Sequence, residues 1–166
     1  MGSEESKEHD LRLPTIEWED LDEDDLVALV ARVAGHLVPG DIVVLRGEVG
    51  AGKTTFVRAA ARALGVRETV TSPTYQFARG YEGSAGGRAV AVNHLDLYRL
   101  EELDVRDALD LDEYLDAGSV TFMEWADPAL HLLAEPNVVE ILHRTPDTRR
   151  VRLSGPLAAR LSSKPC

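Results

Sequence analysis

One eight-residue stretch has the residue types and spacing of a phosphate-binding loop. Residues 47–54 read Gly-Glu-Val-Gly-Ala-Gly-Lys-Thr, which matches the pattern G-x-x-x-x-G-K-[ST] at every position. Glycines allow the backbone to turn its N–H groups inward around an anion, because they adopt φ and ψ values that other residues avoid. Lys53 supplies a cation for the β- and γ-phosphates, and Thr54 supplies a hydroxyl for Mg²⁺. The stretch therefore predicts a nucleoside triphosphate site.

The segments on either side are those that a phosphate-binding loop requires. Residues 41–46 read Asp-Ile-Val-Val-Leu-Arg, a short β-branched run that is typical of a buried strand. From Lys53 to Leu64 the apolar residues recur at helical spacing, and Gly65 follows as a C-terminal cap. Strand, glycine loop and helix thus come in the required order, and the helix offers its positive end to the anion.

The nucleobase is predicted by exclusion. A switch GTPase would carry the guanine-binding tetrapeptide N-K-x-D and a D-x-x-G motif after a strand, and neither occurs in the chain. ATP is therefore favoured over GTP.

Two predicted strand ends carry the carboxylates that phosphoryl chemistry needs. Residues 94–99 read His-Leu-Asp-Leu-Tyr-Arg, and strand alternation places His94, Asp96 and Tyr98 on one face. A later apolar run ends in Glu124. Because ligands gather at the carboxyl ends of strands in open α/β sheets, we expect Glu124 to reach the metal and Asp96 to act beside the loop.

Three further features each have two interpretations. His94 is either part of the site or an ordinary half-buried histidine. Trp125 is either a core residue or a platform on which the base stacks. The segment 70–75, Val-Thr-Ser-Pro-Thr-Tyr, lies where P-loop switches sense the γ-phosphate, or it is a simple proline turn.

The remaining sequence predicts an α/β fold: a P-loop NTPase-like three-layer sandwich with a mixed central sheet and a β-rich second half. The acidic cluster at 19–25 suits the start of a helix, since carboxylates favour the positive end of the helix dipole, and Pro39-Gly40 ends that helix. Gly83, Gly86 and Gly87 predict a turn between two strands. The other predicted elements are strands at 11–17, 70–79, 88–97, 119–123, 138–143 and 150–153, and a helix at 101–117.

Length and charge limit the class of protein. The chain has 166 residues and a net charge of −11, which predicts one domain over residues 11–166 behind a disordered acidic tail at 1–10. An acidic protein is repelled by phosphate backbones and is a poor candidate for binding nucleic acid alone. The acidity serves either solubility or contact with a basic partner protein.

Targeting signals and cysteines add little. Cys166 is the single cysteine, so an internal disulfide and a multi-cysteine metal site are excluded. The N-terminus lacks a signal-peptide pattern, and no run approaches the roughly 20 apolar residues that span a bilayer. We therefore expect a cytoplasmic protein without membrane contact.

These motifs together resemble one family. The loop at 47–55, the Ser-Pro-Thr-Tyr of 72–75, the His-x-Asp-x-Tyr-Arg of 94–99 and Glu124-Trp125 resemble the TsaE (YjeE) ATPases in order and spacing, from about residue 20 to residue 155. The loop alone is shared by many families, whereas the other elements are more particular. The resemblance implies a cytoplasmic bacterial ATPase that helps to make threonylcarbamoyladenosine in tRNA, at the adenosine beside the anticodon. It implies ATP and Mg²⁺ as cofactors, slow hydrolysis by the chain alone, TsaD and TsaB as partners, and tRNA contact only through them.

The resemblance also implies roles by position. Asp96, Lys53 and Glu124 would serve hydrolysis, and Thr74 would lie in the switch-like segment. Glu48 departs conservatively from the Asp that the family usually has there. The residues that would bind phosphate are Gly50, Ala51, Gly52, Lys53, Thr54 and Thr55; those that would bind Mg²⁺ are Thr54 and Glu124; those that could approach the nucleoside are Glu23 and either Arg149 or Arg150.

Two other functions compete with this interpretation. A small-molecule P-loop kinase would need an acceptor pocket and an arginine-bearing lid, yet residues 101–117 carry Arg106 as their single arginine among many carboxylates. A nucleotide-sensing module without turnover would not need Asp96 and Glu124.

Overall fold

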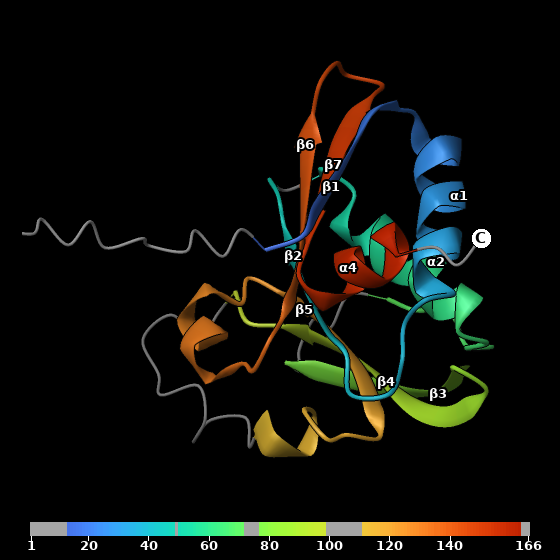
Figure 1. Cartoon of the computed structure of the whole chain (residues 1–166), viewed down its shortest axis with the longest axis vertical. Helices are drawn as coiled ribbons and strands as arrows, with labels where there is room; N and C mark the ends of the chain where they lie inside the picture. Colours follow the sequence, from blue (N-terminus) through green and yellow to red (C-terminus); the bar gives the residue numbers. More distant parts are fainter. Residues whose placement is uncertain (1–12, 49, 72–76, 99–110, 164–166) are drawn as a thin grey trace, which may run out of the picture.

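A computed structural model describes residues 13–48, 50–71, 77–98 and 111–163, which build a seven-stranded mixed β-sheet with helices packed on it (Figure 1). The strand order is β1-β7-β6-β2-β5-β4-β3. Strand β2 runs parallel to β5 and β6, and β4 runs parallel to β5. The pairs β1–β7, β6–β7 and β3–β4 are antiparallel. The strands span Thr15–Leu21 (β1), Ile42–Arg46 (β2), Ala78–Ala85 (β3), Arg88–Asp96 (β4), Ser119–Glu124 (β5), Asn137–His143 (β6) and Arg149–Ser154 (β7).

The central strands of the sheet are buried on both faces. The helices α1 (Glu23–Ala34), α2 (Lys53–Ala63) and α4 (Pro156–Ser162) lie on the same side of it in Figure 1. Val43 and Leu45 of β2 face the apolar core beneath these helices. Ile42 and Val44 face a second core, which two 3-10 helices cover. The central strand is therefore apolar from Ile42 to Leu45, as is typical of strands in parallel sheets that are covered on both faces. The 3-10 helices span Leu111–Glu113 and Asp127–Leu132.

The acidic residues at 22–25 begin the first helix as predicted, whereas those at 19 and 20 belong to the edge strand that precedes it. Asp22 caps α1 and forms a capping box with Asp25, whose side chain accepts from the Asp22 amide. The predicted strand at 11–17 is observed later, at Thr15–Leu21. Its carboxylates are tolerated because β7 opposes them with arginines, and Glu17 accepts from Arg150 at 2.6 Å. The helix itself ends at Ala34, before Pro39-Gly40.

The turn that three glycines predicted is shorter than expected. The turn is made by Gly86 and Gly87, whereas Gly83 lies inside β3, which runs from Ala78 to Ala85. A Cβ on Gly83 would lie 2.7 Å from the carbonyl oxygen of Leu64, so glycine is needed there for close packing against the end of α2. Of the predicted strand at 70–79, Ala78 and Arg79 lie in β3, residues 70, 71 and 77 lie outside any strand, and residues 72–76 lie outside the described ones. Of the predicted helix at 101–117, the described part begins with a 3-10 turn at residue 111.

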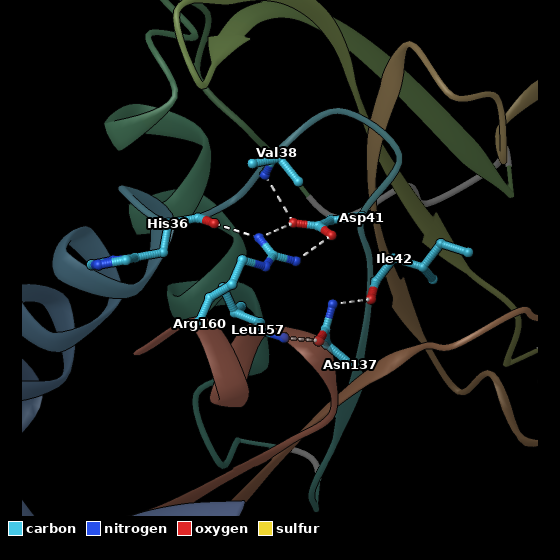
Figure 2. A network of polar contacts seen from close by, with 7 residues as sticks. All are labelled: His36, Val38, Asp41, Ile42, Asn137, Leu157 and Arg160. Atoms are coloured by element: carbon cyan, nitrogen blue, oxygen red, sulfur yellow. Dashed lines mark hydrogen bonds and ion pairs between the residues drawn. The ribbon is translucent and has the colours of Figure 1, made fainter. Parts of the chain in front are cut away.

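The short helix α4 was not predicted, and the hydrogen bonds of two polar side chains tie it to the amino end of β2 (Figure 2). Arg160 donates to both carboxylate oxygens of Asp41, at 2.9 and 2.6 Å. Asn137 donates to the Ile42 carbonyl oxygen at 3.1 Å and accepts from the Leu157 amide at 2.7 Å. These contacts anchor the end of β2 that is opposite to its glycine loop. None of the helices in the described ranges is both long and apolar enough to cross a membrane.

Candidate phosphate site

The glycine loop joins the carboxyl end of β2 to the amino end of α2. Gly47, Gly50 and Gly52 have φ values of +153°, +82° and +117°, which L side chains rarely adopt. A Cβ on Gly47 would also lie 2.6 Å from the carbonyl oxygen of Ile141. Gly52 is the N-cap residue of α2 and brings no side chain that would fill the anion-binding end of the helix. The backbone of the loop therefore requires the glycines of the motif.

We predict that Gly47→Ala lowers the melting temperature because the new Cβ meets backbone that cannot move aside. Strain of this kind costs about 1–3 kcal/mol, and each kcal/mol lowers the melting temperature by about 2–4 °C in a chain of this size. Gly87→Ala is the matched control, since Gly87 has a φ of +77° but nothing within 4 Å of the added Cβ. Thermal unfolding followed by circular dichroism measures both. Equal losses would mean that the contact with Ile141 is unimportant.

Lys53 is held at the mouth of this loop by two contacts. Its side chain is mostly buried, at 7% exposure, and Nζ donates to the Gly47 carbonyl oxygen at 2.7 Å. The same ammonium lies 4.1 Å from the centre of the Trp125 ring, a cation–π contact. The Lys53 side chain therefore reaches back from the first residue of α2 to the start of the loop, and its positive charge lies close to the amino end of the helix.

Trp125 reaches the lysine because its backbone is left-handed. It directly follows β5 and has a φ of +55°, an uncommon conformation for a bulky residue. Tyr98 packs against the indole edge-on, with ring centroids 5.0 Å apart, although 58% of its own surface is exposed. The Trp125 ring is half-buried and covers the Lys53 ammonium, so it is not simply a core residue, and its stacking on a base stays a prediction.

Two carboxylates meet where β4 and β5 end. Asp96 and Glu124 are register partners on these parallel strands, and Glu124 is in turn the partner of Leu45 on β2. The three strands thus deliver the glycine loop and both carboxylates to one edge of the sheet, as the strand-end argument predicted. His94 is fully buried on β4, and its Nε2 lies 2.6 Å from Oε2 of Glu124. It is therefore not the ordinary half-buried histidine of the alternative.

The environment of Asp96 favours its protonated form. Burial raises the pKa of the Asp96 carboxyl above its usual value, and the neighbouring Glu124 adds to the rise. The backbone N–H of Tyr98, 3.0 Å from Oδ1, lowers the pKa in part, as do His94 and Lys53. A carboxylate with a raised pKa is a stronger proton acceptor. This property is the one expected of a group that supports hydrolysis.

The structure distinguishes the two arginines that the resemblance leaves as alternatives. Arg149 of β7 donates from Nε to the Ala51 carbonyl oxygen at 2.6 Å and packs against Gly52. Arg150 faces away from the loop and pairs with Glu17 and, at 3.5 Å, with Glu19. Only the register of β7 decides which of two adjacent arginines meets the loop, so the sequence could not distinguish them.

The other predicted site residues lie at or near the loop. Ala51 is fully buried, and Thr54 and Thr55 are half-buried in the first turn of α2. Glu23 is the exposed first residue of α1, the helix whose Leu26 packs against Gly52. Its approach to a nucleoside stays a prediction. Thr74 lies outside the described residues.

Fold and site together define a mixed α/β protein whose central strand leads through a glycine loop into a helix, with a lysine and two carboxylates at the same sheet edge. The chain belongs to the family of the threonylcarbamoyl adenosine biosynthesis protein TsaE, whose sequence profile matches residues 13–152. The family that the motifs indicated is thereby confirmed.

Individual relatives carry the same name. TsaE of Bacillus subtilis is 31% identical over 135 residues, which cover 81% of this chain and 82% of that protein. TsaE of Streptomyces coelicolor is 44% identical over 105 residues, or 63% of this chain and 69% of the relative. The crystal structure of Bacillus subtilis YdiB superposes with a TM-score of 0.71 and 26% identity, covering 90% of this chain and 95% of that one.

Proposed function

We propose that this chain is a cytoplasmic P-loop ATPase that binds Mg·ATP, hydrolyses it slowly when alone, and serves threonylcarbamoyl modification of the tRNA adenosine beside the anticodon together with TsaB and TsaD. The name of its relatives supports the pathway. The observation that carries the ATPase activity is the meeting of Lys53, Glu124 and Asp96 beside a loop whose backbone requires glycine.

The residues present fit a magnesium nucleotide. The Thr54 hydroxyl and the Glu124 carboxylate are the hard oxygen ligands that Mg²⁺ prefers. Within the described residues, no group of three or more His, Cys, Asp or Glu side chains could hold a metal by itself. This agrees with Mg²⁺, which is usually bound by one or two protein oxygens, phosphate oxygens and water.

Each residue then has a distinct task. Bound Mg·ATP supplies the phosphoryl group and neutralises part of its charge. The loop amides and the end of α2 would hold the phosphates, and Lys53 would add a third contact, to the β- and γ-phosphates, beside its two present ones. Asp96, half-buried and with a raised pKa, would accept a hydrogen bond from the attacking water. The acidity of the chain supports tRNA contact through the partners rather than directly.

Phosphate release by the purified chain tests this proposal. We expect slow, Mg²⁺-dependent release from ATP that increases when TsaB and TsaD are added. Rapid phosphate transfer to a small metabolite would favour the kinase instead. ATP binding without any release, even with both partners present, would favour a nucleotide-sensing module.

A further inference from the structure

A buried histidine touches the carboxylate that we assign to the metal. Nε2 of His94 lies 2.6 Å from Oε2 of Glu124, and the two side chains are 1% and 6% exposed. Water therefore has almost no access to this contact, and it cannot be an incidental surface pair. Neither the family name nor the loop motif assigns a task to this residue.

Strand geometry sets the direction of the contact. His94 is the register partner of Phe122 on the parallel strand β5, and Glu124 stands two residues further along the same face of that strand. The imidazole thus reaches diagonally toward the carboxyl end of the sheet. It meets Glu124 from inside the protein, while the loop approaches from the edge, where β2 ends.

Burying a histidine at this position has a free-energy cost that an apolar residue in the same place would not have. Its second nitrogen, Nδ1, is buried and has no hydrogen-bond partner among the described residues. Leaving a buried polar atom unpaired costs free energy, because the atom loses its hydrogen bonds to water and gains none in the protein. An apolar side chain would pack into the sheet at this position without that cost. The compensating gain is therefore found at the other nitrogen, in the contact with Glu124.

We propose that His94 is a positioning residue: it holds Oε2 of Glu124 from behind, so that the other oxygen, Oε1, is presented to the divalent cation of the nucleotide. This inference rests on the proposed function, because it gives Glu124 a metal to bind. Carboxylates that ligate metals are commonly fixed in this way by a further hydrogen bond, and loss of such a partner weakens metal affinity by about 10–100-fold.

Metal binding, rather than turnover, tests the inference. The protein is saturated with ADP and titrated with Mn²⁺, which takes the same oxygen ligands and is followed by electron paramagnetic resonance. We expect His94→Leu and His94→Asn to weaken Mn²⁺ binding about 10–100-fold, because neither places a donor at the Nε2 position. His94→Gln places an amide there and should restore most of the affinity. ADP affinity in EDTA should stay within about twofold of the wild type in all three.

Asn93→Ala is the matched control for damage to β4. Asn93 is equally interior, at 5% exposure, but its amide donates to the Tyr114 carbonyl oxygen on the opposite face of the sheet. We expect this variant to bind Mn²⁺ normally. The inference is overturned if Asn93→Ala weakens Mn²⁺ binding as much as the His94 variants, or if whichever of His94→Leu and His94→Asn folds binds Mn²⁺ like the wild type. Failure of the wild type to bind ADP at all would instead remove the proposed function.

Discussion

Replacing Lys53 with alanine is expected to reduce ATP turnover by about 10²–10³-fold, the usual loss when one preorganised donor to a developing negative charge is removed. The lysine is mostly buried and is fixed by Gly47 and Trp125 before any ligand arrives, so little ordering would be left for the reaction. An ammonium in such a place acts more strongly than in water, because the surrounding protein screens it less. Steady-state phosphate release with excess Mg·ATP measures the effect.

Arg62→Ala is the control for the loss of one positive charge on the same helix. Arg62 lies in the last turn of α2 and is exposed, far along the helix from the loop. It should leave turnover close to that of the wild type. Circular dichroism must show that both variants are folded. Wild-type turnover in folded Lys53→Ala protein would contradict the assignment of the loop as the phosphate site.

The local parts of the site could be predicted because their signals are local. The loop is eight consecutive residues, and the helix start at Asp22 needs only residues up to Asp25. The two carboxylates also follow from local patterns, since each stands at the end of a predicted strand. That Asp96 and Glu124 become direct neighbours depends on the adjacency of β4 and β5, which the general rule for strand ends anticipates without fixing the strand order.

The contacts that could not be predicted join residues that are distant in the chain. Arg149 reaches Ala51, and His94 reaches Glu124, only after strand register has been set. Register is decided by the whole pattern of buried side chains, and a shift by one residue would exchange the roles of the two adjacent arginines. Gly83 shows the same limit for the fold. The sequence indicates a turn residue there, whereas the glycine is needed for its close approach to Leu64, which is distant in the chain.

Trp125 illustrates a third kind of limit. Its place above Lys53 depends on a positive φ, which is uncommon for a residue with a large side chain. No propensity in the sequence indicates such a backbone conformation. A left-handed residue at the end of a central strand is typical of sites where the surrounding structure enforces strain for a purpose. Here it places an aromatic ring over the lysine instead of in the core.

Asp96→Asn is expected to lower turnover by about 10²–10⁴-fold, the range for loss of a positioned proton acceptor, and at the same time to raise stability at neutral pH. The second effect follows from burial, which raises the pKa of the Asp96 carboxyl in the folded protein. The folded state then binds the proton more tightly than the unfolded state does. The stabilising contribution of this proton is complete below the pKa of the unfolded state, near the usual value of 3.8, and is lost as the pH rises through the higher pKa of the folded state. Asparagine carries no charge and avoids that loss.

Urea unfolding in a pH series separates this effect from a general gain in stability. The asparagine variant should unfold at higher urea concentration than the wild type at pH 7.5, and the difference should shrink as the pH falls toward 4. Asp147→Asn makes the same change of charge at an exposed position of the β6–β7 turn and should show no such trend. A difference that is constant with pH would mean that Asp96 is not a destabilised carboxylate. Retained turnover in Asp96→Asn would exclude Asp96 from hydrolysis. Lost turnover together with gained stability would show that Asp96 destabilises the fold and that its charge is needed for the reaction.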